Sequence, residues 1–133
     1  MKYIMDSCVL LWFVMESDKL SPRARAIISD PLVEVFVSTV SLWELSLKLA
    51  RGKLTLKNIE VGDLLEILYE SGLSIIGLNE LESSSFHRLS EVKGHRDFFD
   101  RMLIWQCITR GITLISNDTS FEAYRSFGLR LLW

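Results

Sequence analysis

The sequence has few cysteines and histidines, and their spacing excludes a zinc-binding module. Only two of the 133 residues are cysteine and two are histidine. Cys8 and Cys107 lie far apart, and no group of cysteine and histidine has the short spacing of a structural zinc site. We expect both thiols to be reduced and buried in the core of an intracellular, cytoplasmic protein.

Long apolar runs and glycine-rich loops are also missing. No stretch approaches the ~20 apolar residues that span a bilayer, so we expect no membrane partner. The N-terminal segment meets an acid at Asp6 and therefore lacks the apolar core of a signal peptide. Neither G-x-G-x-x-G nor G-x-x-x-x-G-K occurs, which excludes the two common nucleotide-binding loops.

No sign of charge dominates the chain. There are 15 Lys and Arg against 17 Asp and Glu, and the net charge is -2. This balance argues against a wholly basic nucleic-acid binder but permits a local basic rim. Apolar residues make up 49%, which indicates a packed globular protein, and the length fits one domain over residues 1–133.

Short apolar segments alternate with helical segments along this chain. Strands are expected at 2–5, 33–37, 73–76, 112–115 and 129–133. Helices are expected at 7–14, 22–29, 42–51, 61–71, 80–89, 97–110 and 121–127. The alternation predicts an α/β fold in which right-handed crossovers place helices on both faces of a parallel sheet.

Four acidic residues occupy comparable positions in this pattern. Asp6, Glu44 and Asp118 each follow the end of an expected strand, and Asp100 opens the helix that leads into the next strand. In a doubly wound sheet these turns face one crevice. Structural interpretations stay open for each: Asp6 as a helix cap, Ser41 and Glu44 as a capping box, and Asp118 in an Asx-turn.

Asp100 belongs to the heptapeptide 95–101, which carries two acids and two arginines around an aromatic pair. The apolar residues that follow Asp100 at helical spacing are Leu103, Ile104, Cys107 and Ile108. A carboxylate at the edge of a buried face needs a partner, and a metal ion is one such partner. Alternatively, Asp97 caps the helix and Asp100 lies in its first turn.

Four carboxylates held close together repel one another unless a cation compensates. All-oxygen ligation favours Mg²⁺ or Mn²⁺ over zinc. Such an ion polarises phosphoryl oxygens and generates hydroxide at neutral pH, so the predicted reaction is metal-assisted phosphodiester hydrolysis. Phosphate-binding cations are expected around the site at Lys48, Arg51, Lys53, Arg96 and Arg101.

Alternative roles stay open for two of the basic residues and for one histidine. Lys48 has the spacing to pair with Glu44, and Arg101 has the spacing to pair with Asp97. His95 can contact the substrate, or it can have a purely structural role.

Four segments carry a family resemblance. They are Asp6-Ser7-Cys8-Val9-Leu10-Leu11-Trp12, Ser38-Thr39-Val40-Ser41-Leu42-Trp43-Glu44 with Lys48 and Gly52-Lys53-Leu54, His95-Arg96-Asp97-Phe98-Phe99-Asp100-Arg101, and Ser116-Asn117-Asp118. In this order they resemble the PIN domain, and within it the VapC-type ribonuclease toxins of prokaryotic toxin–antitoxin pairs. The resemblance covers nearly the whole chain.

The resemblance implies a five-stranded sheet in the order 3-2-1-4-5 and an endoribonuclease that depends on Mg²⁺ or Mn²⁺. It implies that Asp6, Glu44, Asp100 and Asp118 are the catalytic and metal-binding acids. It also implies a homodimer, a VapB-type antitoxin that blocks the site, and an RNA substrate, with tRNA and rRNA as candidates.

Further roles follow from position in the matched motifs. Ser7 is expected to contact substrate together with the cations, while Asp97, Ser38 and Asn117 are expected to support the acids. Phe98 departs from the pattern, because the subgroup usually has proline there, and Trp105 replaces a small residue.

Two other function classes compete with the nuclease. One is a catalytically silent PIN-like module that only binds another protein. The other is a phosphoacceptor receiver-like domain, which needs adjacent acids after strand one, whereas Asp6 is followed by Ser7. The many aromatic residues favour a dimer through Trp12, Phe13 and Trp105, unless these lie in the core.

Overall fold

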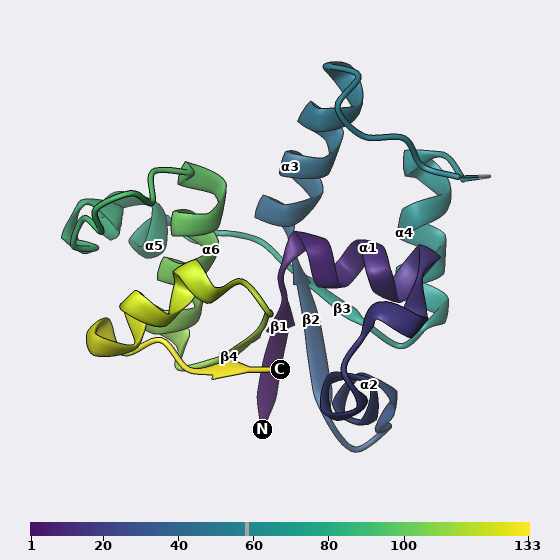
Figure 1. Ribbon diagram of the computed structural model, residues 1–133, viewed down its shortest axis with the longest axis horizontal. Helices are drawn as coiled ribbons and strands as arrows, with labels where there is room; N and C mark the ends of the chain where they lie inside the picture. The colour runs from purple at the N-terminus through teal and green to yellow at the C-terminus, as the bar shows by residue number, and fades with distance from the viewer. Residues whose placement is uncertain (58) are drawn as a thin grey trace.

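Five short apolar segments form one parallel sheet in a computed structural model that describes residues 1–57 and 59–133 (Figure 1). The strands are β1 (Lys2–Met5), β2 (Glu34–Ser38), β3 (Ser74–Ile76), β4 (Thr113–Ile115) and β5 (Leu131–Leu132). Their order is β3-β2-β1-β4-β5, and every neighbouring pair is parallel. Both the expected α/β class and the expected strand order are confirmed.

Helical segments connect these strands. The α-helices are α1 (Ser7–Met15), α2 (Pro22–Ser29), α3 (Thr39–Ala50), α4 (Val61–Glu70), α5 (Glu80–Ser85) and α6 (Phe98–Arg110). Three segments are 3-10 helices: η1 (Ser17–Lys19), η2 (Phe86–Arg88) and η3 (Thr119–Phe127). The helices expected at 80–89 and 121–127 are therefore wholly or partly 3-10. In the described ranges, no helix has the length and apolar character to cross a bilayer.

Alternate residues of the central strand pack into two separate layers. Tyr3 and Met5 join a core cluster with α1, α2 and α4, whereas Ile4 joins a second cluster with α6 and η3. Figure 1 shows these two sets of helices on opposite faces of the sheet. A strand has a period of two residues, so each face receives every second side chain, and the expected helix layers on both faces are confirmed.

The start of α3 differs from the sequence prediction. The helix begins at Thr39 and is capped by Ser38, whose Oγ accepts a hydrogen bond from the Val40 amide at 3.1 Å. The predicted capping box between Ser41 and Glu44 is wrong, because both residues lie inside the helix. Strand β2 ends at Ser38, so the chain passes from strand to helix without a loop.

The two cysteines also differ from each other. Cys107 is buried as predicted, but Cys8 is exposed. The first turn of α1 buries Val9 and Leu10 instead, which leaves Cys8 on the outer side of the helix.

Ser38 has a second role that ties three elements together. Its hydroxyl donates to Oε1 of Gln106 at 2.6 Å, and Nε2 of Gln106 donates to the Gly77 carbonyl at 3.2 Å. Gln106 is completely buried in the middle of α6. The bonds therefore fix the start of α3 and the end of β3 against α6.

We expect Ser38→Ala to lower the free energy of unfolding by about 2–4 kcal/mol, because it removes a helix cap and leaves a buried amide oxygen without a donor. Urea denaturation followed by circular dichroism measures the change. Ser21→Ala is the matched control: Ser21 caps α2 through the Ala24 amide only. Its loss should cost about 1 kcal/mol. Equal losses in the two variants would show that the bond to Gln106 adds no net stability.

Candidate functional site

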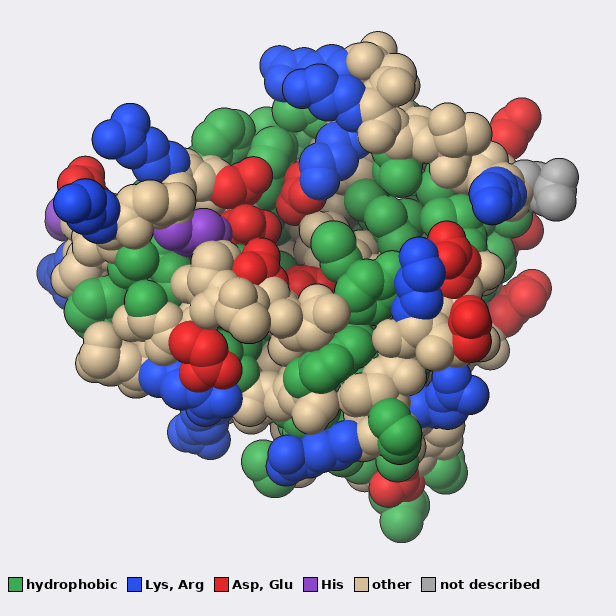
Figure 2. Space-filling model, in the orientation of Figure 1, with side chains coloured by type: hydrophobic (Ala, Val, Ile, Leu, Met, Phe, Trp, Pro, Cys, Tyr) green, Lys and Arg blue, Asp and Glu red, His purple; other side chains and the backbone are tan. Residues whose placement is uncertain are grey.

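A pocket of about 400 Å³ lies where the loops after β1 and β4 meet α3 and α6. Its lining residues are Asp6, Ser7, Cys8, Trp12, Glu44, Lys48, Asp97, Asp100, Asn117, Asp118 and Phe121. All four acids that were expected to share a crevice line it. Figure 2 shows acidic side chains gathered around a hollow in this face, with Lys and Arg side chains along the adjoining end of α3.

Asp6 is buried at the start of α1, with 6% of its surface exposed. Its Oδ1 caps the helix by accepting from the Val9 amide at 2.7 Å, so the capping interpretation is confirmed. Burial raises the pKa of Asp6 to about 6, and the nearby charges of Asp118 and Glu44 act in the same direction. Asp6 is therefore both a cap and a destabilised charge in the pocket.

Glu44 is buried from α3 and held by two donors. The Ser7 hydroxyl lies 3.2 Å from each carboxylate oxygen, and Nζ of Lys48 lies 2.6 Å from Oε2. The expected pair between Glu44 and Lys48 is confirmed, and its hydrogen bond raises the pKa of Lys48. The Ser7 hydroxyl therefore supports Glu44, and because Ser7 also lines the pocket, its expected contact with substrate stays a prediction.

Asp100 is partly buried in the first turn of α6. Oδ1 of Asp97 accepts from the Asp100 amide at 3.0 Å, which confirms Asp97 as the cap of this helix. Oδ2 of Asp100 lies 3.2 Å from Nε2 of His95. Burial raises the pKa of Asp100 to about 6 and the charge of Asp97 adds to the effect, while His95 opposes it.

A chain of hydrogen bonds continues behind Asp100. Nδ1 of His95 lies 2.6 Å from the Tyr124 hydroxyl, which also accepts from the Arg101 guanidinium at 3.0 Å. Arg101 donates to two backbone carbonyl groups as well. The prediction that Arg101 binds phosphate is therefore corrected: its side chain is buried and engaged in holding the loop before α6.

Sequence reasoning missed Tyr124 altogether. It lies in η3, 29 residues from His95, and a buried aromatic residue in a short helix gives no local sign of a polar role.

The remaining predicted residues lie at different depths. Asp118 and Asn117 are exposed at the pocket, and Asp118 accepts from the Ser120 amide at 2.9 Å, so the Asx-turn is confirmed. Arg96 is exposed in a neighbouring pocket. Ser38 does not line the acidic pocket; the support that it gives is through the start of α3.

The donor set of the pocket fits a hard dication. Its carboxylates supply only oxygen ligands, which Mg²⁺ and Mn²⁺ prefer. The raised pKa values of Asp6 and Asp100 come first from burial and then from neighbouring acids, and a bound cation would oppose both effects. In the part of the chain that the structure describes, no three His, Cys, Asp or Glu side chains are close enough to hold one ion. Carboxylates repel one another, so Glu44 lies against Lys48 and Asp100 against His95.

Comparisons with known proteins place this fold in a family. The model of the PIN domain family matches residues 3–126. Among solved structures, VapBC2 from Rickettsia felis, bound to a DNA fragment from their promoter, contains a similar chain (TM-score 0.67, 16% identity, covering 99% of this chain and 98% of that chain).

Two further solved structures have the same fold. One is a member of the VapBC family of toxin–antitoxin systems, VapBC-5 from Mycobacterium tuberculosis (TM-score 0.63, 15% identity, covering 98% and 95%). The other is VapBC-1 from nontypeable Haemophilus influenzae (TM-score 0.61, 15% identity, covering 99% and 97%). A search of the curated proteins found no significant match.

We expect Asp6→Asn to stabilise the fold at pH 8 in the presence of a chelator. The folded-state pKa of Asp6, about 6, lies above its ordinary value of 3.8, so the folded protein keeps a proton that the unfolded chain has lost between these values. Stability therefore falls as pH rises through this window and does not recover above it. Asparagine removes the charge and keeps an oxygen for the Val9 amide, so the gain should be about 1–3 kcal/mol.

Thermal and urea denaturation at pH 4 and pH 8 measure this gain, which should be larger at pH 8. The control is Asp18→Asn, which changes an exposed acid in η1. A loss of stability in Asp6→Asn at pH 8, with Asp18→Asn unchanged, would contradict the expectation.

Proposed function

This chain belongs to the PIN domain family, and we propose that it is a metal-dependent endoribonuclease acting as the toxin of a VapBC-type toxin–antitoxin pair. The observation that carries the proposal is the pocket itself. Acids from four distant segments, Asp6, Glu44, Asp100 and Asp118, line one hollow at the edge of the sheet. Structural needs alone favour dispersing such charges, because each buried carboxylate costs free energy.

The four acids are proposed to hold Mg²⁺ or Mn²⁺. When bound, such an ion lowers the pKa of a water ligand and stabilises charge on a phosphoryl oxygen. Asp6 is pre-positioned for this role, because its cap bond uses Oδ1 and its carboxylate is fixed by the start of α1. His95 and Tyr124 hold the Asp100 carboxylate from behind.

Lys48 is the cation best situated to receive a substrate phosphate. Its side chain is 44% exposed, although Nζ lies against Glu44. If Glu44 held a metal ion, the ammonium group of Lys48 would be available to bind a phosphate oxygen of the substrate. The same residue then neutralises the acid in the resting protein and the RNA backbone in the complex.

The proposed partners follow from the structural relatives. Several are VapBC assemblies, so we propose a VapB-type antitoxin as a partner. From the resemblance to VapC-type toxins we also propose that this partner covers the acidic pocket and that the toxin is a homodimer in the cytoplasm. The aromatic residues suggested for the dimer are each partly buried. Trp12 packs on Trp133 with ring centroids 5.6 Å apart, and Nε1 of Trp105 donates to Ser85 at 3.2 Å.

Purified protein should cleave single-stranded RNA in Mg²⁺ or Mn²⁺ and stop when the metal is chelated. Asp100→Asn and Glu44→Gln should each lower kcat/KM at least about 100-fold, because a metal site supplies several kcal/mol of charge stabilisation. Calorimetric titration with Mn²⁺ should show the same variants losing metal affinity.

Glu80→Gln is the control for that experiment, because Glu80 is an exposed acid on α5 and outside the pocket. It should cleave and bind Mn²⁺ like the unmodified protein. If the unmodified protein neither binds Mn²⁺ nor cleaves any RNA, the catalytically silent binding module becomes the better assignment.

Expression in a bacterial host should stop growth, since an unrestrained endoribonuclease depletes RNA. Asp100→Asn should grow normally at equal protein level, measured by immunoblot. Co-expression of a small DNA-binding protein encoded beside the toxin should restore growth to the unmodified chain. Growth arrest by both forms alike would assign the toxicity to something other than cleavage.

A further inference from the structure

Two large aromatic side chains lie exposed beside the acidic pocket. Trp43 on α3 is 59% exposed and Phe98 at the start of α6 is 57% exposed. Their ring centroids are 6.4 Å apart, although 55 residues separate them along the chain. Neighbouring exposed apolar side chains are unfavourable in water, and such patches often mark binding sites.

A buried ring fixes both exposed rings in place. The centroid of Phe99 lies 4.9 Å from that of Trp43, edge to face, and 4.5 Å from that of Phe98. Phe99 itself is 7% exposed. The aromatic pair is therefore anchored to the core and presents its remaining surface to solvent.

Phe98 adjoins the acids on one side through a second pocket of about 330 Å³. The lining residues are Glu44, Leu47, Lys48, Arg51, Lys53, Asp97, Phe98 and Phe99. Three of them, Glu44, Lys48 and Asp97, also line the acidic pocket, so the two hollows are contiguous. A bound polymer that extends past the acids at this end would contact Phe98 next.

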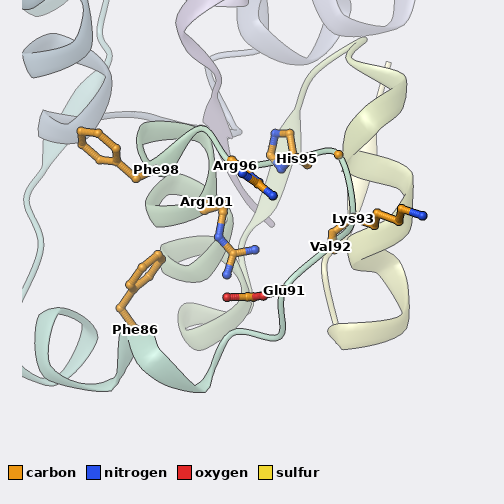
Figure 3. Close-up of a pocket in the computed structure, with 9 residues that line it drawn as sticks. Phe86, Glu91, Val92, Lys93, His95, Arg96, Phe98 and Arg101 are labelled. Atoms are coloured by element: carbon orange, nitrogen blue, oxygen red, sulfur yellow. The ribbon is translucent and has the colours of Figure 1, made fainter.

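On its other side, Phe98 borders a third pocket of about 590 Å³ (Figure 3). The Phe98 and Phe86 rings lie along one side of this hollow, with Arg96 and Arg101 between them and the loop that carries His95. His95 contacts Asp100, so this pocket too reaches the acidic site.

The charges around the aromatic pair identify the occupant. One pocket beside Phe98 is lined by three cations and two acids, namely Lys48, Arg51, Lys53, Glu44 and Asp97. The other is lined by three cations and one acid, namely Lys93, Arg96, Arg101 and Glu91. Cations therefore outnumber acids in both pockets that border Phe98, although the whole chain has a net charge of -2. Single-stranded nucleic acid offers the matching chemistry, because flat bases stack on aromatic rings while phosphates meet cations. In a duplex the faces of the bases are stacked on one another and are not available to an aromatic side chain.

We propose that Trp43 and Phe98 form a stacking platform for a base of single-stranded RNA next to the phosphodiester that is cut. The inference rests on the proposed ribonuclease function and adds the residues that bind a base beside the cleaved phosphodiester. The platform holds a nucleotide between the cations at and just after the end of α3 and Arg96, and so sets which phosphate enters the acidic pocket.

Anisotropy of a fluorescent single-stranded RNA of about 12 nucleotides tests the platform in an Asp6→Asn background, which prevents cleavage. Trp43→Ala and Phe98→Ala should each raise Kd about tenfold or more. Trp43→Phe and Phe98→Tyr keep a ring and should stay near the Asp6→Asn parent. Tyr69→Ala, an exposed aromatic residue on α4 (64% exposed), should leave Kd unchanged.

The second measurement is the kcat and KM of RNA cleavage by variants that carry the same substitutions but keep Asp6. A stacking role raises KM and leaves kcat largely intact, whereas loss of folding lowers kcat and alters the circular dichroism spectrum. If RNA is cleaved normally and the alanine variants match Tyr69→Ala, the platform is rejected while the ribonuclease stands.

Two other results also overturn the inference. Equal weakening of single-stranded and duplex RNA would show that stacking is not involved. Unchanged RNA affinity with loss of antitoxin binding would reassign the aromatic pair to a protein partner. If the unmodified protein neither binds nor cleaves RNA, the function and the platform fail together.

Discussion

The free-energy cost of burying carboxylates close together at one edge of a sheet is the constraint on which the arrangement of this site depends. Asp6 is 6% exposed and Glu44 5%, so neither is screened well by water. Each acid lies against a nearby donor: Asp6 against the Val9 amide, Glu44 against Lys48, Asp100 against His95, and Asp118 against the Ser120 amide. These donors lower the pKa values of Asp6 and Asp100, but burial has the larger effect and the pKa of each stays raised to about 6.

Structural and chemical roles coincide at these positions. A carboxylate has two oxygens, and a helix cap uses one of them, so capping by Asp6 through Oδ1 does not prevent it from acting in the pocket. Capping also fixes the carboxylate to the first turn of a helix. Asp97 also combines two roles: it caps α6, and its bond with the Asp100 amide fixes the position of the Asp100 carboxylate. The structural and functional interpretations of the sequence were therefore not exclusive.

Polar bonds buried away from the pocket hold its walls. The contact between Ser38 and Gln106 joins the helices that carry Glu44 and Asp100. The bonds from Arg101 to Tyr124 and from Tyr124 to His95 connect the loop before α6 to η3. Buried polar groups are costly when unsatisfied, so these bonds favour one relative position of α3, α6 and η3. The same packing brings Trp43 and Phe98 together at the rim.

The sequence by itself determined the local elements and the acids. Periodicity predicted the strands and both helix layers, and the stop at Gly111 is confirmed by its φ of 65°. The strand order came from the family resemblance, since periodicity does not encode the neighbours of a strand. Only the tertiary structure decided that Arg101 is buried, that Ser7 supports Glu44 and that Tyr124 matters. Their partners are 23 to 37 residues away, beyond the reach of helical or strand spacing, and burial is a property of the packed chain.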